Sequence, residues 1–74
     1  MRSFGKKLRT LRLKRKLTLK ELVHELGYIA HGYLSEIESG KKKPTVDLVL
    51  KVADFFGVTT DQLLRDDMKL TSRS

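Results

Sequence analysis

Apolar residues recur at intervals of three and four along most of the chain, and no stretch alternates between apolar and polar positions as a strand would. This spacing predicts an all-α fold, a compact five-helix bundle. The residues expected to face its core are Phe4, Leu8, Leu11, Leu22, Val23, Leu26, Leu34, Ile37, Val49, Val52, Ala53, Phe56, Leu63 and Leu64.

Capping residues set the expected helix boundaries. Thr18 with Glu21 three residues later forms a capping box, in which each side chain satisfies a backbone N–H of the helix start. Thr59 and Gln62 repeat this pattern. The first three expected helices span residues 3–16, 19–26 and 31–39. A fourth is expected between its cap Thr45 and Gly57, which ends it, and a short fifth helix is expected after its cap Thr59.

The length of 74 residues corresponds to one small domain. We expect that domain in residues 1–65 and a short polar tail in residues 66–74, where the periodicity is lost. The chain carries a net charge of +7, concentrated in residues 1–16 and in the run 41–43. In the first helix, the basic residues are expected opposite the apolar stripe. This imbalance favours a polyanionic partner, either nucleic acid or an anionic membrane surface, over the alternative of a merely solvated surface.

Several classes of protein find no support in the sequence. The absence of cysteine excludes disulfides and thiolate-bound zinc, and it fits a reducing, cytoplasmic location. No apolar run approaches the roughly 18 residues of a membrane span. His24 and His31 lack a nearby third ligand, so no metal site is expected. No catalytic constellation appears, so we expect neither an enzyme nor a cofactor, and no small-molecule ligand is inferred.

The second and third expected helices form a pair joined by a turn that begins at Gly27, which is the arrangement of a helix-turn-helix. Periodicity places a set of mainly small and polar residues on the outward face of the third helix, and three lysines follow its end. Such a face suits the DNA major groove, and the lysines suit the phosphate backbone. The outward set is His31, Gly32, Ser35, Glu36 and Ser39.

Three segments, "LTLKELVHELG", "YLSEIESGKKKPT" and "FFGVTTDQLL", carry a resemblance to a known family. In these segments the chain resembles the lambda-repressor-like (Xre-type) helix-turn-helix domain, over roughly residues 4–65. The resemblance implies a five-helix bundle that binds operator DNA, usually as a two-fold dimer on a palindromic site.

The resemblance also implies roles for individual residues. The base-reading positions of the family fall on His31, Gly32 and Glu36. The backbone-contacting positions fall on Ser35, Ser39, Lys41, Lys42 and Lys43. A structural ion pair would join Arg12 to Glu38 and support the third helix from behind. Two positions depart from the family: the turn "GYIAH" is one residue longer, with Ala30 where a serine cap is usual, and Leu19 replaces a phosphate-contacting glutamine.

Other interpretations of the base-reading residues remain open from the sequence. Gly32 either lets the backbone approach DNA closely or only helps to start the helix. His31 either donates to a guanine edge or a phosphate, or is an exposed polar residue of the first turn. Glu36 either accepts a hydrogen bond from a cytosine amino group or lies at the rim of the groove.

The sequence therefore predicts a sequence-specific double-stranded DNA-binding transcriptional regulator, working as a homodimer in a bacterial or phage-type cytoplasm. Leu64, Met68 and Leu70 are the candidates for the dimer contact. The alternative from another class is a protein-interaction module of the same fold, such as an antitoxin or an adaptor. A membrane-surface role of the basic first helix is a third interpretation.

Overall fold

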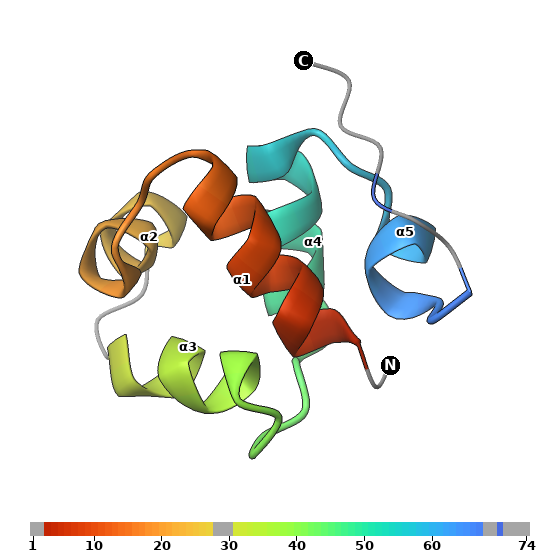
Figure 1. Cartoon of the computed structure of the whole chain (residues 1–74), viewed down its shortest axis with the longest axis horizontal. Helices are drawn as coiled ribbons and strands as arrows, with labels where there is room; N and C mark the ends of the chain where they lie inside the picture. Colours follow the sequence, from red (N-terminus) through yellow and green to blue (C-terminus); the bar gives the residue numbers. More distant parts are fainter. Residues whose placement is uncertain (1–2, 28–30, 68–69, 71–74) are drawn as a thin grey trace.

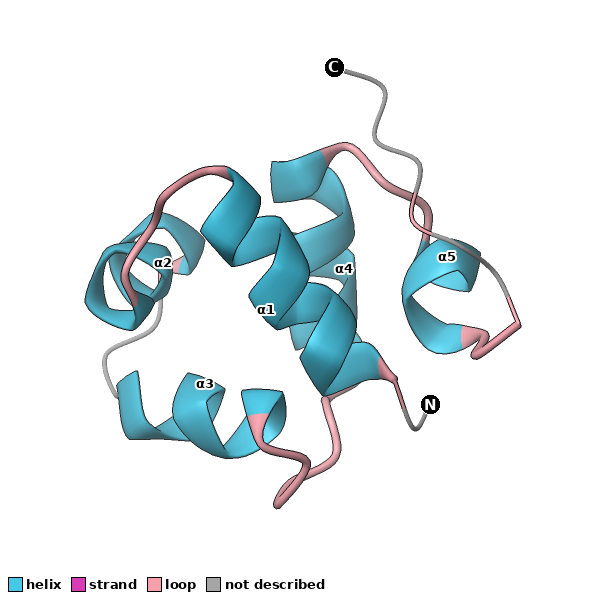
Figure 2. Ribbon diagram, viewed as in Figure 1, coloured by secondary structure: helices cyan, strands magenta, loops and turns pink. Residues whose placement is uncertain are grey.

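The computed structural model describes residues 3–27, 31–67 and 70, and within these ranges it contains helices and no strand (Figures 1 and 2). The expected all-α architecture is confirmed. The helices are α1 (Phe4–Lys14), α2 (Leu19–Leu26), α3 (His31–Glu38), α4 (Val46–Phe56) and α5 (Thr60–Leu64).

Helix α1 passes through the middle of the molecule and connects its two sides (Figure 1). It packs against α3 on one side and against α5 on the other. Helix α2 packs against α3 and α4, and α4 packs against α5. None of the helices in the described part of the chain has the length and apolar character that crossing a bilayer requires.

A single apolar core lies between the helices and contains nearly all of the residues predicted for it. Its buried members are Phe4, Leu8, Leu11, Leu22, Val23, Leu26, Leu34, Ile37, Leu48, Val49, Val52, Ala53, Phe56, Val58 and Leu63. Leu64 is only partly buried, whereas Leu48 and Val58 were not predicted as core residues. Because the apolar stripe of α1 is buried here, it is not available to a membrane surface.

The predicted capping boxes are present at both helix starts. Thr18 Oγ1 accepts the N–H of Glu21 at 3.1 Å, and a carboxylate oxygen of Glu21 accepts the N–H of Thr18 at 2.8 Å. The second of these bonds is the main reason why the pKa of Glu21 lies below its ordinary value. Thr59 and Gln62 exchange the same two bonds at the start of α5.

The first and third helices are shorter than predicted. Helix α1 ends at Lys14 because Lys16 adopts a left-handed conformation, with φ of 57°. The N–H groups of Lys16 and Leu17 then bond to the carbonyls of Leu13 (2.9 Å) and Arg12 (3.1 Å), which closes the helix in a Schellman motif. Helix α3 ends at Glu38, one residue before the predicted end.

Lys7 contradicts the expectation that the basic residues of α1 face away from the core. Its side chain is buried, and Nζ donates to the carbonyls of Gln62 (2.5 Å) and Arg65 (2.6 Å) at the end of α5. An ammonium group at this position satisfies carbonyls that the short helix leaves without a helical partner. The residues just before α1 are joined to the same region, since Ser3 N and Oγ both donate to Asp66 Oδ1.

Candidate nucleic-acid interface

Helix α3 packs into the domain through one face and presents the other to solvent. Leu34 and Ile37 are buried against the neighbouring helices, whereas Gly32, Ser35 and Ser39 are exposed. His31 begins α3, but its side chain lies outside the described part of the structure. Apolar residues on one face and small polar groups on the other leave room for a second surface to approach the α3 backbone.

The chain turns sharply at the end of α3 and exposes three consecutive lysines. Gly40 has φ of +83°, a left-handed conformation that residues with a Cβ rarely adopt. The N–H of Gly40 bonds to Ile37 O at 3.1 Å, and the N–H of Lys41 bonds to Glu36 O at 2.9 Å. Residues 41–43 are all exposed as a result, and they lie directly beside the outward face of α3.

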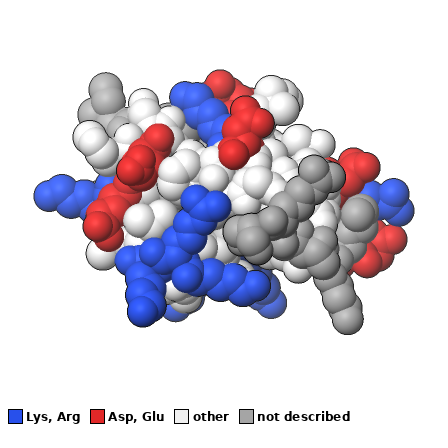
Figure 3. Space-filling model, turned by 90° about the horizontal axis from the view of Figure 1, so that it is seen from above, with Lys and Arg blue, Asp and Glu red and all other residues white. Residues whose placement is uncertain are grey.

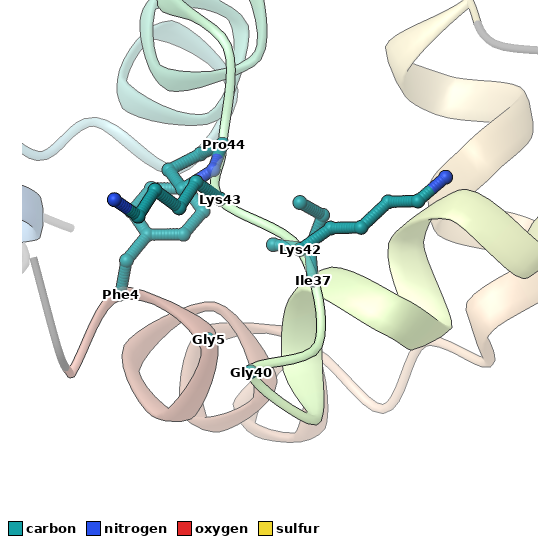
Figure 4. Close-up of a pocket in the computed structure, with 7 residues that line it drawn as sticks. All are labelled: Phe4, Gly5, Ile37, Gly40, Lys42, Lys43 and Pro44. Carbon is teal, nitrogen blue, oxygen red and sulfur yellow. The ribbon is translucent and has the colours of Figure 1, made fainter.

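The side chains of Lys42 and Lys43 point in opposite directions (Figure 4). Lys42 extends along α3, where Nζ lies 3.5 Å from a carboxylate oxygen of Glu36 and 6.0 Å from the ring centre of Tyr33. Lys43 extends over Phe4 instead. The ion pair with Glu36 joins two partly exposed side chains, so separating it in favour of a phosphate costs only about 1 kcal/mol or less.

Behind α3, Arg12 of α1 connects both helices of the helix-turn-helix pair. Its Nε and Nη2 donate to the two carboxylate oxygens of Glu38 at 2.8 and 3.1 Å, and Nη1 donates to Leu17 O at 2.8 Å. Leu17 immediately precedes the cap of α2, and Glu38 ends α3. The structure therefore contains the Arg12–Glu38 ion pair that the resemblance implies. Only 11% of the Arg12 side chain and 7% of the Glu38 side chain are exposed.

Comparisons with known proteins agree with this geometry. A sequence profile of the helix-turn-helix family matches residues 8–63, which is most of the chain. The chain belongs to this family, in its Xre or lambda-repressor-like branch. The N-terminal DNA-binding domain of SinR from Bacillus subtilis has the same fold, with a TM-score of 0.81 and 26% identity, and the match covers 93% of this chain and 100% of that domain.

Curated relatives of the chain are transcriptional regulators. The chain is 35% identical over 68 residues to the HTH-type transcriptional activator BcrR of Enterococcus faecalis, covering 92% of this chain and 33% of that protein. It is 35% identical over 75 residues to the cryptic phage CTXphi transcriptional repressor RstR of Vibrio cholerae, covering 95% and 67%. The regulator ImmR of Bacillus subtilis (strain 168) is 37% identical over 65 residues, covering 88% and 50%. The chain thus spans between one third and two thirds of the length of these relatives.

The two departures from the helix-turn-helix family lie at the edges of α2. Leu19 begins α2, and its partly buried side chain packs against the core, so it cannot replace the polar side chain of the usual glutamine. The longer turn, including Ala30, lies outside the described residues. Among the described residues, no three acidic or His side chains come together as a metal-ligand group.

Basic charge is not confined to the α3 side of this helix-turn-helix domain. Figure 3 shows the molecule from above, so that α3, which lies at the bottom of Figure 1, is on the far side. Lys and Arg side chains gather in one part of this upper face, whereas acidic side chains are scattered around it. Charge alone therefore does not single out one face of the domain.

Sequence reasoning missed the contact between Glu36 and Lys42. The two residues are six positions apart, a spacing that does not bring side chains together on one straight helix. The left-handed turn at Gly40 folds the chain back and makes the contact possible. The glycine that follows α3 was the available signal, because it predicts a reversal of direction at this point.

Proposed function

We propose that this chain is a sequence-specific regulator that binds double-stranded DNA with α3 in the major groove. The observation that carries the proposal is the exposed, small and polar face of α3, continued by three exposed lysines. An α-helix with its side chains is about 10–12 Å across, which matches the roughly 12 Å width of the major groove. Such a regulator acts in the cytoplasm of a bacterium or of a phage-infected cell, and the proposal requires no cofactor or small-molecule ligand.

The proposal assigns the contacts according to their position around α3. His31, Gly32 and Glu36 face the base edges, with Gly32 allowing close approach of the backbone and Glu36 accepting from a cytosine amino group. Ser35 and Ser39 lie near the sugar-phosphate backbone. Lys41, Lys42 and Lys43 bind phosphates. To do so, Lys42 leaves its ion pair with Glu36.

We further propose that two copies bind one palindromic operator and contact each other through α4 and α5. A hollow of about 290 Å³ opens there, and its lining is almost entirely apolar. Val46 and Leu50, two of the residues that line it, are 77% and 52% exposed, which is unusual for large apolar side chains. The lining residues are Pro44, Val46, Val49, Leu50, Thr60 and Leu64.

Size and continuity favour a second copy as the occupant. The domain measures 30 × 26 × 19 Å, and half-sites one helical turn apart are separated by about 34–36 Å, so two copies aligned along their longest axis are only about 4–6 Å apart on one duplex. The hollow also begins at Pro44, directly after the lysines. Of the predicted dimer residues, Leu64 lines the hollow, Leu70 packs against the core of its own chain, and Met68 lies outside the described residues.

Selection from a randomised duplex library at two salt concentrations tests the DNA-binding proposal. We expect enrichment of a palindrome whose binding survives the higher salt. With six to ten phosphate contacts, affinity should fall roughly 10³- to 10⁵-fold between about 50 and 200 mM salt. If no sequence is enriched and binding disappears as salt rises, sequence-specific recognition is wrong and the protein-interaction module becomes the better interpretation.

A pair of matched substitutions tests the dimer. Val46→Glu places a charge in the hollow, whereas Leu13→Glu places one on an equally apolar, 52% exposed position of α1. Sedimentation on the selected palindrome should show one bound copy for Val46→Glu and two for Leu13→Glu and the parent. Two bound copies of Val46→Glu with unchanged affinity would show that this surface is not the contact.

A further inference from the structure

Gly5 lies where α1 crosses the C-terminal end of α3, and it is buried (Figure 4). A Cβ atom built on Gly5 would lie 2.3 Å from Ile37 O and 2.8 Å from Glu38 O. Both distances are far below the 3.4 Å at which ordinary contacts begin. The backbones of α1 and α3 therefore touch at this point, with no space for any side chain between them.

The same end of α3 is held at a second point on α1. Glu38, whose carbonyl lies beside Gly5, sends its carboxylate to Arg12, two helical turns further along α1. A backbone contact and a bidentate ion pair at separate points define both the distance and the direction of α3 relative to α1. A glycine inside a helix costs about 0.5–1 kcal/mol relative to alanine, and this close approach is a physical reason for its presence in α1.

We propose that Gly5 is a positioning residue for DNA recognition, because it sets how closely α3 approaches α1 and hence how α3 is presented beside the lysines. This inference rests on the proposed function of α3. For an ordinary contact, a methyl group at position 5 and Ile37 O have to move about 1.1 Å apart, which is the difference between 3.4 and 2.3 Å. The obstructing atoms are backbone carbonyls, which cannot rotate away as a side chain does. Since only one end of α3 is pushed, the helix tilts.

The tilt is measured without DNA. Residual dipolar couplings of Gly5→Ala give the angle between α1 and α3, and Gly32→Ala is the matched control. An added Cβ at Gly32 meets nothing within 4 Å, although that residue is also a helical glycine. We expect a changed angle and a lower melting temperature for Gly5→Ala, and an unchanged angle with an equal or higher melting temperature for Gly32→Ala. An unchanged angle in Gly5→Ala overturns the proposal.

The consequence for recognition is measured as the ratio of affinities for the selected duplex and for a random duplex. We expect this ratio to fall roughly 10- to 100-fold in Gly5→Ala, equivalent to losing one or two base contacts. Val58→Ala provides a destabilised control, because Val58 is a buried residue of the segment between α4 and α5 and is not part of the contact between Gly5 and the end of α3. The ratio should stay unchanged in Val58→Ala, and an equal fall in both variants overturns the role of Gly5.

Measurements at about 15 °C with trimethylamine N-oxide, conditions that favour the folded state, keep Gly5→Ala folded for these tests. The two readouts separate the inference from the function on which it rests. If the parent selects no sequence, the proposed function fails while the helix angle still reports on Gly5. If the parent selects a palindrome and Gly5→Ala selects it equally well, the function stands and the positioning role is wrong.

Discussion

Truncation of Glu38 provides a direct measure of how strongly α3 is held to α1. Glu38→Ala removes both acceptors of the bidentate pair and leaves Arg12 with only its bond to Leu17 O. Arg12 has then lost the carboxylate of Glu38. Its charge stays nearly buried, because only 11% of its side chain is exposed. Breaking a buried pair in this way costs about 3–5 kcal/mol, and the remaining hydration of Arg12 reduces the expectation to about 2–4 kcal/mol.

That loss is large for a domain of this size, whose core supplies a net stability of only about 3–5 kcal/mol. One kcal/mol shifts the melting temperature of such a domain by about 4–8 °C, so we expect a decrease of roughly 8–32 °C. Urea titration followed by circular dichroism, supported by thermal melting, measures the change. Glu36→Ala is the matched control, because its pair with Lys42 is exposed, and we expect its stability to change by no more than about 0.5 kcal/mol.

A double substitution separates the unpaired charge from the loss of support. Arg12→Met with Glu38→Leu removes both charges and retains apolar volume, so it should recover most of the stability lost in Glu38→Ala. If Glu38→Ala unfolds at the same urea concentration as the parent protein, the pair does not stabilise α3 and the reasoning is refuted.

Three further predictions concern Lys7, Glu21 and the lysines after α3. Lys7→Met keeps the packing of the stem but removes the ammonium from the end of α5, so it should cost about 1–3 kcal/mol and speed amide exchange in α5, as measured by NMR. Because the pKa of Glu21 is lowered in the folded state, its contribution to stability is present above the unfolded pKa and is lost as pH falls through the folded value. Urea titrations should therefore show that lowering the pH from about 5 to 3 reduces the free energy of unfolding less in Glu21→Gln than in the parent protein. Lys42→Gln should weaken binding to the selected duplex less than Lys43→Gln, because the parent Lys42 has to give up its ion pair with Glu36 before it binds a phosphate. Equal losses of affinity for the two lysine variants would contradict this.

Features that depend on neighbouring residues were predictable from the sequence. The Thr18–Glu21 capping box joins groups three residues apart, and the structure contains it as expected. The buried and exposed faces of α3 likewise follow from helical periodicity alone, as Leu34 and Ser35 illustrate. The roles of the exposed residues of α3 toward DNA stay predictions.

Features that depend on how helices cross were not predictable in the same way. The carbonyl partners of Lys7 lie 55 and 58 residues later in the chain, and no local pattern indicates that one lysine of a basic block turns inward. Gly5 had a usable signal, because a glycine inside a strongly periodic helix suggests a packing reason. The position of the contact, the end of α3, becomes apparent only once the helices are assembled.

The attachment of α5 to Lys7 has a consequence for the order in which the chain folds. Helix α5 has five residues, far fewer than the roughly 12–15 needed for an isolated helix to persist in water. Its last carbonyls are satisfied by a side chain near the opposite end of the sequence, so a large loop of chain has to close before α5 gains that stabilisation. A chain emerging from the ribosome therefore completes α5 only after nearly all of the domain has been synthesised, and the α4–α5 hollow does not exist on the nascent chain until then.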